Sequence, residues 1–442
     1  MDRILQKFVP DPFVIAIFLT FLTFALAVIY RPEPEQSSMD AAFQAILFWG
    51  DGIWNLTDFT MHMAMILIGG FVVATSRPIQ YLLGKLVTWV QTPVQAVLFC
   101  TGAAIAASWV NWGFGLVVGG FVALEAGRRL PHIPFRVLVA SSYSGFLVWH
   151  AGLSGSVPLD MNTEGKVFTG NLGMDLVGVN QTLFGSFNLF ALAAIACLLP
   201  MVNLFNLKLA EDDPASNIEA FTNVETNLEE QNNDENENWL NRTWLAVALL
   251  FALAGFYAYV LWVDESRHWQ LNLNTINLAL FMLGMLLHGT PRNFINAVTE
   301  AAPKIAPILI QYPLYSAIMS VLNQSGLAEQ ISSWFVDNSS ASTFPLMTFY
   351  SAGILNLFVP SGGGQWAVQA PIIIPAAQAL DVDISKVAMA VAWGDAWTNM
   401  AQPFWAIPLL SIAGLKIKDI IGFCLINLIA SGIVLSLLFL MV

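Results

Sequence analysis

Residues 343–379 read TFPLMTFYSAGILNLFVPSGGGQWAVQAPIIIPAAQA and contain no charged side chain. The stretch is longer than the ~20 residues that cross a bilayer as one helix, and Pro360 and three glycines interrupt it near its middle. Proline disfavours a continuing helix, and glycine permits backbone conformations that other residues resist. Irregular backbone at membrane depth needs partners from protein or from a water-filled cavity. The stretch is therefore predicted to be a re-entrant hairpin.

A second apolar stretch, residues 93–127, is interrupted in the same way. Its middle reads Asn111-Trp-Gly-Phe-Gly115, and it too is longer than one crossing helix. It is predicted to form a second re-entrant hairpin. Two further apolar segments, 137–157 and 384–407, contain polar residues and glycine, the second also Pro403, and are predicted to be broken membrane helices.

The composition indicates a membrane protein. Of the 442 residues, 57% are hydrophobic and 11% are charged, whereas a soluble domain carries about 25% charged residues. The three cysteines have neither disulfide nor zinc spacing. The predicted fold class is an all-α polytopic membrane protein with about nine transmembrane helices plus the two hairpins. The spans are predicted at 12–30, 54–76, 137–157, 183–206, 243–263, 274–289, 303–322, 384–407 and 419–441.

The charged residues predict the orientation of the chain. Residues 211–237 hold ten acids and no Lys or Arg, so 208–242 is predicted to be an acidic, disordered cytoplasmic linker. This pattern does not indicate a nucleic-acid partner, and the lipid bilayer is the expected surrounding. With the N-terminus cytoplasmic and the C-terminus periplasmic, 13 of the 17 basic residues lie inside. The exceptions are Arg31, Lys166, Arg267 and Lys386.

The order of elements predicts an inverted repeat. Residues 1–207 and 264–442 carry the same sequence of spans, hairpin and broken helix in opposite orientation, and the span at 243–263 connects them. Inverted repeats with paired broken helices are the architecture of many secondary carriers. A channel is the alternative, since two hairpins that meet at the midplane could line a pore. No phosphate loop, HExxH or GxSxG motif is present, so an enzyme is not expected.

The second interruption is the strongest candidate binding site. A helix that starts near Gln365 would aim the amides of Ser361 to Gly364 at one point, which makes a ready anion site. The alternative is a glycine kink that allows close helix packing. No Lys or Arg lies at either interruption, which favours a solute with a single negative charge. The predicted substrate-binding residues are Asn111, Trp112, Gly113, Ser154, Asn356, Ser361, Gly362, Gly363, Gly364, Gln365, Asn399 and Gln402.

Asp395, Thr398 and His150 are predicted to couple transport to an ion. Asp395 is taken as the only deeply placed acid, and a carboxylate at the bilayer centre costs about 2.5–3.5 kcal/mol. Burial favours its neutral, protonated form, and an imidazole can change its charge near neutral pH. The alternatives are structural: Asp395 as a packing acid paired with a neighbouring donor, and His150 as an ordinary hydrogen-bonded residue. Sodium is the rival ion, with Thr398, Asn399 and Asn111 as ligands; no resident cofactor or metal is expected.

Several strings resemble the short-chain fatty acid transporter family, which belongs to the ion transporter superfamily. They are Pro10-Asp-Pro-Phe13, Trp49-Gly-Asp-Gly-Ile-Trp-Asn55, Val110-Asn-Trp-Gly-Phe-Gly-Leu-Val-Val-Gly119, Val359-Pro-Ser-Gly-Gly-Gly-Gln-Trp366 and Asn399-Met-Ala-Gln-Pro-Phe-Trp405. The resemblance covers nearly the whole chain. It implies uptake of small monocarboxylates, such as acetoacetate or butyrate, across the bacterial inner membrane. It also implies a homodimer with a scaffold domain and an elevator-type transport domain that holds two hairpins.

The resemblance implies an acidic residue at the position of Asp395, and this chain has one there. It does not imply a histidine at the position of His150. Together, the residues and the resemblance predict a secondary carrier that imports short-chain fatty acids, coupled to a proton and alternatively to sodium. The preference for fatty acids comes from the resemblance alone.

Overall fold

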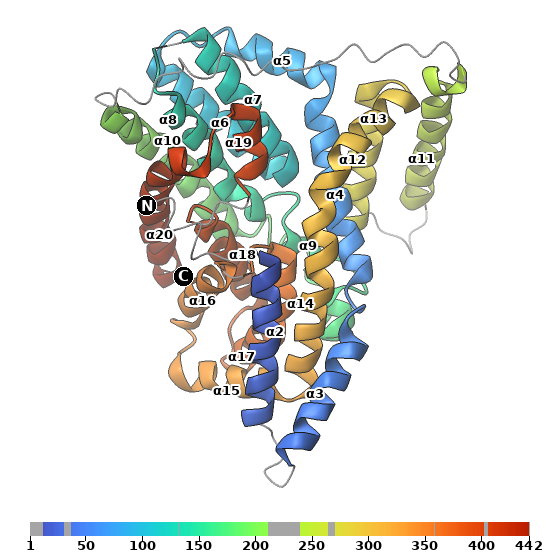
Figure 1. The fold of residues 1–442 in the computed structure, drawn as a ribbon, viewed down its shortest axis with the longest axis vertical. Coiled ribbons are helices and arrows are strands. Elements are labelled where there is room, and N and C mark those ends of the chain that lie inside the picture. The colour runs from blue at the N-terminus through green and yellow to red at the C-terminus, as the bar shows by residue number, and fades with distance from the viewer. Residues whose placement is uncertain are drawn as a thin grey trace.

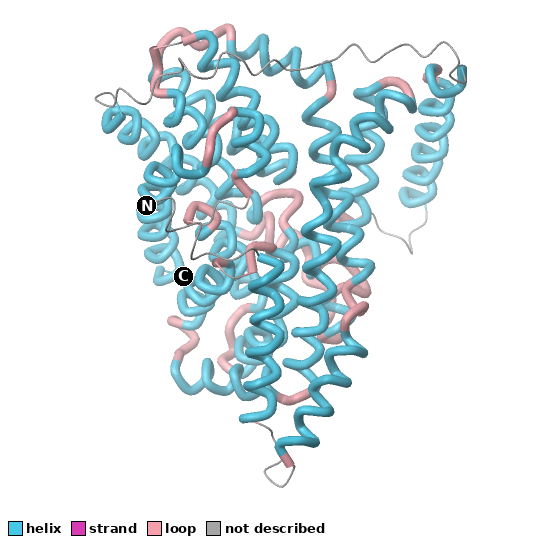
Figure 2. The backbone as a smooth tube through the Cα atoms, viewed as in Figure 1, coloured by secondary structure: helices cyan, strands magenta, loops and turns pink. Residues whose placement is uncertain are grey.

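A computed structural model of the chain describes residues 12–30, 37–130, 132–210, 239–263, 270–357, 359–401 and 405–441. Within these ranges every regular element is a helix (Figure 2), which confirms the all-helical class. Among the described residues, five helical segments are long and apolar enough to cross a membrane: Thr57–Thr75, Pro93–Val110, Ser186–Ala210, Pro291–Gln324 and Ile417–Met441. The inverted repeat and the number of spans stay predictions. Most of the predicted acidic linker, 211–238, lies outside the described residues.

A tall group of helices stands on one side of the molecule (Figure 1). Its members are α2 (Pro12–Ile29), α3 (Ser38–Gly52), α4 (Thr57–Thr75), α12 (Leu273–His288) and α14 (Ala306–Gln324). The sequence predicted no span at α3. Ser316 of α14 holds the break between α3 and α4, because its hydroxyl donates to the Gly52 carbonyl at 2.6 Å and accepts from the Leu56 amide at 3.2 Å. We call this group the scaffold.

The first predicted hairpin corresponds to α6 (Pro93–Val110) and α7 (Trp112–Arg129), which a single residue joins. That residue, Asn111, is extended, with φ −157° and ψ 131°. The two helices pack tightly, since a Cβ added at Gly115 would lie 2.2 Å from Oγ of Ser108. This close approach explains why glycine follows the break.

The first broken segment lies against this hairpin. α8 (Phe135–Ser144) tightens into a 3₁₀ helix, η1 (Gly145–Ala151), and α9 (Ser156–Met161) follows after a short turn. Gly145 packs against α6, where a Cβ would lie 2.6 Å from Cβ of Ala104. A π turn, η2 (Val167–Asn171), and the long α10 (Ser186–Ala210) complete this part.

The second hairpin corresponds to α16 (Phe344–Asn356) and α17 (Gly362–Ala379). α18 (Ile384–Thr398) packs along α16, because Gly394 brings the two backbones together: a Cβ there would lie 2.3 Å from the Phe349 carbonyl oxygen. The chain ends in α19 (Ile407–Ala413) and α20 (Ile417–Met441), and α20 packs on α10. The other helices are α5 (Arg77–Val87), η5 (Trp239–Arg242), α11 (Leu245–Val263), α13 (Pro291–Ala301), η6 (Ala302–Ile305) and α15 (Leu327–Asn338).

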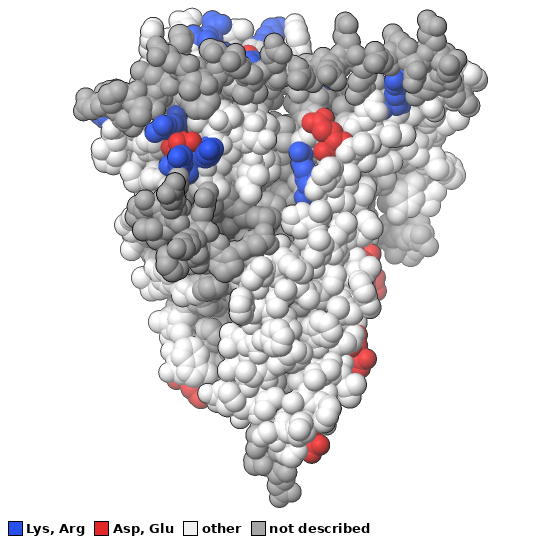
Figure 3. Space-filling model, viewed as in Figure 1, with Lys and Arg blue, Asp and Glu red and all other residues white. Residues whose placement is uncertain are grey.

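Charge is unevenly distributed along the molecule. On the face shown in Figure 3, the Lys and Arg side chains gather at the end where α5 and α13 lie, and the charged side chains towards the opposite end are acidic. Basic residues near the cytoplasmic ends of spans are typical of bacterial membrane proteins.

Candidate functional site

The tips of the two hairpins face one narrow cavity. The first tip contributes Trp112, and the second contributes Ser361 and Gly362. The scaffold closes the opposite side with side chains of α4 and α14. The remaining lining residues are Met63, Phe146, Trp149, Ser156, Ile308, Tyr312 and Trp405. Two interruptions that lie about 250 positions apart in the sequence therefore meet at the same place.

Asn111 organises the first tip. Its side-chain oxygen caps α7 by accepting from the Phe114 amide at 2.8 Å, and its Nδ2 lies 3.4 Å from the Ile66 carbonyl of the scaffold. The amide of Trp112 donates to the Ser154 hydroxyl at 2.9 Å. Asn111 and Ser154, both predicted to bind substrate, thus hold the tip in shape.

Ser361 organises the second tip in a similar way. It is extended, with φ −156°, and its hydroxyl oxygen accepts from the Gly364 amide at 3.4 Å. The same hydroxyl donates to the Tyr312 hydroxyl of α14 at 2.8 Å. The amides of Gly362 and Gly363, the first two in α17, have no hydrogen-bond partner in the described part of the chain. They are the donors at this tip that an anion can use.

Glycine is required at the second tip because both sides are occupied. A Cβ on Gly362 would lie 2.7 Å from Cε1 of His150. A Cβ on Gly363 would lie 2.6 Å from Cε1 of Phe59 on the scaffold. Real Cβ atoms do not approach ring atoms so closely, so any side chain here would push the tip away from both walls.

His150 and Asp395 form a buried pair behind this tip. His150 Nδ1 lies 2.9 Å from Asp395 Oδ2, and both side chains are essentially inaccessible, at 0% and 1% exposure. The Val157 amide donates to His150 Nε2 at 3.1 Å, so Nε2 is an acceptor and carries no hydrogen. The hydrogen therefore sits on Nδ1 and points at the carboxyl group of Asp395.

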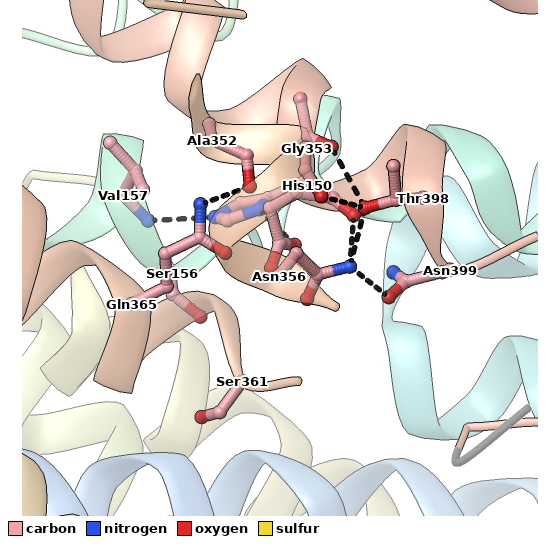
Figure 4. Close-up of polar contacts among 12 residues, drawn as sticks. His150, Ser156, Val157, Ala352, Gly353, Asn356, Ser361, Gln365, Thr398 and Asn399 are labelled. Carbon is pink, nitrogen blue, oxygen red and sulfur yellow. Dashed lines mark hydrogen bonds and ion pairs between the residues drawn. The ribbon is translucent and has the colours of Figure 1, made fainter. Parts of the chain in front are cut away.

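Asn356 ties the second hairpin to α18 (Figure 4). Its Nδ2 lies 2.8 Å from the Asp395 carbonyl oxygen, 2.9 Å from Thr398 Oγ1 and 3.0 Å from Asn399 Oδ1. Thr398 in turn donates to the Gly353 carbonyl at 2.9 Å. We call His150, Asn356, Gln365, Asp395, Thr398 and Asn399 the polar cluster.

Three oxygen atoms of the polar cluster are buried without a hydrogen-bond partner in the described ranges. They are Oδ1 of Asp395, Oδ1 of Asn356 and Oε1 of Gln365. Gln365 uses its Nε2 to donate to the Ala352 carbonyl at 3.0 Å (Figure 4). A buried polar atom without a partner costs about 1–3 kcal/mol, so three acceptors in one cluster suit a proton or a cation.

The cavity and the polar cluster share a wall. The ring of Trp149 lines the cavity and stacks on His150, with ring centroids 4.1 Å apart. Of the predicted substrate-binding residues, Trp112, Ser361 and Gly362 line the cavity. Asn356, Gln365 and Asn399 lie instead in the polar cluster with the three predicted coupling residues. Gln402 lies outside the described residues.

The sequence analysis missed the scaffold's contribution. Tyr312 and Ile308 of α14, and Met63 of α4, line the cavity, yet their segments were interpreted only as spans. The signal was the presence of Gln311, Tyr312 and Tyr315 within an apolar segment, since polar side chains inside a span usually face the protein interior.

Asp395 is not the only deeply buried acid, as the sequence analysis had assumed. Asp160 is also fully buried, one turn beyond the predicted end of a span at residue 157. Its two oxygens accept from the Trp366 indole at 2.7 Å and from the amides of Val167 and Phe168, each at 2.9 Å. Because these donors satisfy its charge, Asp160 joins the first half of the chain to α17.

Comparison with known proteins agrees with this architecture. A family model described as "Short chain fatty acid transporter" matches residues 1–442. A protein of Escherichia coli (strain K12) named "Putative short-chain fatty acid transporter" is 38% identical over 440 residues, covering 98% of this chain and 96% of the relative. A protein of the same name from Haemophilus influenzae is 35% identical over 445 residues, covering 97% and 95%.

Two solved structures share the fold. The Alcanivorax borkumensis YdaH transporter superposes with a TM-score of 0.60 at 15% identity, covering 97% of this chain and 98% of that one. Neisseria gonorrhoeae MtrF, described within a class of antimetabolite efflux pumps, superposes with a TM-score of 0.54 at 16% identity, covering 98% and 95%. At such identities the likeness concerns the fold alone.

Proposed function

Because the chain belongs to the short-chain fatty acid transporter family, we propose that it imports small monocarboxylates, such as acetoacetate or butyrate, together with a proton. The protein is a multi-pass membrane transporter and not an enzyme. The observation that carries the proposed coupling is the buried His150–Asp395 pair directly behind the glycine tip of the cavity.

The carboxylate of the substrate binds at the start of α17. The amides of Gly362 and Gly363 lie at the start of an 18-residue helix and have no partner among the described residues, and helix N-termini favour anions. The cavity at this tip has no Lys or Arg among its lining residues, so it suits one negative charge better than two. The aromatic walls of Trp112, Phe146 and Trp405 cover the short apolar tail.

The proton binds at Asp395. Since His150 Nε2 is occupied by the Val157 amide, an added proton goes to the carboxylate, whose Oδ1 has no partner within the described segments. Protonation removes a buried negative charge close to the bound anion, so each favours the binding of the other. Such reciprocal coupling is what a symporter requires.

Sodium is the second candidate for the coupled ion. Oδ1 of Asp395, Oδ1 of Asn356 and Oε1 of Gln365 are three buried oxygens without partners among the described residues. Oxygen ligands of this kind suit a hard cation. A sodium ion there would neutralise the same charge as the proton.

Uptake into proteoliposomes separates these possibilities. With an alkaline lumen and choline as the only added cation, the proton-coupled protein accumulates labelled butyrate faster than protein-free liposomes, which neutral butyric acid crosses on its own, and sodium adds little. Accumulation that needs sodium and ignores the pH gradient would transfer the coupling to sodium. Uptake that is faster than in protein-free liposomes but is driven by neither gradient would identify a channel and refute the carrier.

The membrane, the orientation of the protein in it and its oligomeric state are inferred from the family and from the distribution of charge. We infer that the end with the Lys and Arg side chains (Figure 3) faces the cytoplasm of a bacterial inner membrane. We also infer a homodimer in which the hairpins and broken helices move against the scaffold, carrying the substrate in an elevator-type step. Crosslinking of the protein in membranes tests the dimer.

A further inference from the structure

A second cavity adjoins the first on the scaffold side. The two cavities share Ile308, Tyr312, Ser361 and Trp405. The second is lined in addition by Lys304, Pro307, Gln311 and Pro360. The sequence analysis found no basic residue at either interruption, and this remains true along the chain. In the fold, however, Lys304 lies beside the second interruption, because η6 and α14 bring it there.

One helical face of the scaffold supplies the donors of this second cavity. Four of its residues are spaced four, three and one positions apart along the chain, which places them on one side of η6 and α14: Lys304, Ile308, Gln311 and Tyr312. Gln311 is 6% exposed and Tyr312 is 3% exposed. The face presents an ammonium group, a side-chain amide and a phenol to the start of α17.

Gln311 is oriented with its donor group free. Its Oε1 accepts from the Tyr315 hydroxyl at 3.3 Å, so the Nε2 group is left to point elsewhere. Within the described ranges, Nε2 has no hydrogen-bond partner. A buried amide donor in a cavity beside a lysine is suited to bind an oxygen anion.

Lys304 is held only by a weak, exchangeable contact. Its Nζ lies 4.6 Å from the centroid of the Phe71 ring on α4, and it forms no ion pair with the described acids. The residue is partly buried. A lysine on a flexible stem can leave a ring face for a carboxylate and return.

We propose that Lys304 and Gln311 form a second, transient carboxylate subsite, at which a short-chain monocarboxylate stops between the Gly362 tip and the cytoplasmic side. This inference rests on the proposed function and adds a step to it. The first cavity has no basic side chain and binds the carboxylate through helix amides, whereas the subsite in the second cavity uses the mobile positive charge of Lys304. The cation in the second cavity raises the local concentration of anions there without holding them at the Gly362 tip.

Side-specific kinetics of purified, reconstituted protein test the subsite. Exchange of labelled butyrate is measured from each side of the membrane for Lys304→Met, Lys304→Arg and the control Lys85→Met, whose exposed lysine lies on α5 at the same end. We expect Lys304→Met to raise the KM by about tenfold or more on the Lys304 side only, because a charge-assisted contact is lost. Lys304→Arg restores most of the affinity, and Lys85→Met has none of this effect.

Equal KM values for Lys304→Met and the wild type, or equal increases on both sides, would overturn the subsite. So would an increase of the same size in Lys85→Met, which would indicate a general effect of surface charge. A merely structural role for Lys304 would lower the melting temperature of Lys304→Met without the side-specific KM. The melting curve is therefore recorded for each variant.

A failure of the proposed function would look different. If wild-type protein exchanges no butyrate, the transport proposal fails, and the subsite is judged by binding alone. Butyrate added to detergent-solubilised protein should quench tryptophan fluorescence, since Trp405 lines both cavities. The subsite is refuted if Lys304→Met and wild type give the same half-saturating butyrate concentration, or if no quenching occurs.

Discussion

Nδ1 of His150 lies 2.9 Å from Oδ2 of Asp395, and the two residues come from different halves of the chain. The Val157 amide fixes the tautomer by occupying Nε2. Nδ1 of His150 therefore serves as a hydrogen-bond donor that positions the carboxyl group of Asp395, and in the proposed coupling the proton binds to this carboxyl group.

Asp395→Asn should separate exchange from proton-driven accumulation. The asparagine oxygen can still accept from His150 Nδ1, so the local packing is kept while the titratable group is lost. We expect counterflow of labelled butyrate to persist, and the accumulation under an alkaline lumen that exceeds that of protein-free liposomes to be lost. Wild-type accumulation by this variant would remove Asp395 from the coupling step.

Gly362→Ala should block transport by displacing the second hairpin tip from its packing against His150 and Trp149. The added Cβ would lie 2.7 Å from both His150 Cε1 and Trp149 Cη2, and overpacking of this kind costs about 1–3 kcal/mol. Uptake should fall by roughly tenfold or more, as the amides shift from the substrate. Gly102→Ala is the matched control, because nothing lies within 4 Å of its added Cβ in helix α6. Similar uptake by both variants would contradict the close packing at the tip.

Asn356→Asp should loosen the second hairpin from α18. It replaces the Nδ2 donor by an oxygen, which would face the acceptors of Asp395, Thr398 and Asn399. We expect a clearly lower melting temperature in detergent, since breaking a buried hydrogen-bond network costs about 1–3 kcal/mol per unsatisfied group. Asn323→Asp, at an exposed position on α14, should change the melting temperature little. Equal melting temperatures for the two variants would exclude the bracing role of Asn356.

Asp160→Asn should weaken the joint between the first half and α17. The carboxylate accepts from Trp366, Val167 and Phe168, and an amide would set its own N–H₂ group against one of these donors. The expected loss of stability is about 2–4 kcal/mol, seen as a lower melting temperature. Asp175→Asn, at an exposed loop position, is the control. An unchanged melting temperature for Asp160→Asn would show that these contacts contribute little.

Local signals carried much of the fold. Glycine within apolar segments identified both hairpin tips, together with Pro360 at the second, because the conformational demands of these residues do not depend on distant neighbours. Asn111 and Ser361 are also readable, since each has the side-chain oxygen that a helix start requires. The family resemblance rested on the same strings, and the comparisons confirm it.

Contacts between distant segments could not be predicted. Tyr312 reaches Ser361 across 49 positions, and Asp160 reaches Trp366 across 206. Nothing near Lys304 in the sequence indicates that it lies beside the second tip. In a membrane helix most faces are apolar, so hydrophobic periodicity does not reveal which face meets the substrate. Asn356 and Asn399 were predicted to bind substrate, and in the structure they contact each other within the polar cluster, a contact that depends on the packing of distant segments.

The single-residue joint at Asn111 has a mechanical consequence. With α6 and α7 packed along each other and no slack between them, the first tip cannot swing on its own. Any displacement of Trp112 must therefore move α6 and α7 together as one rigid unit. If the cavity opens to alternate sides of the membrane, the displacement of this tip equals the displacement of the whole helices α6 and α7. Residues inserted at Asn111 would uncouple the motion of the tip from that of the two helices.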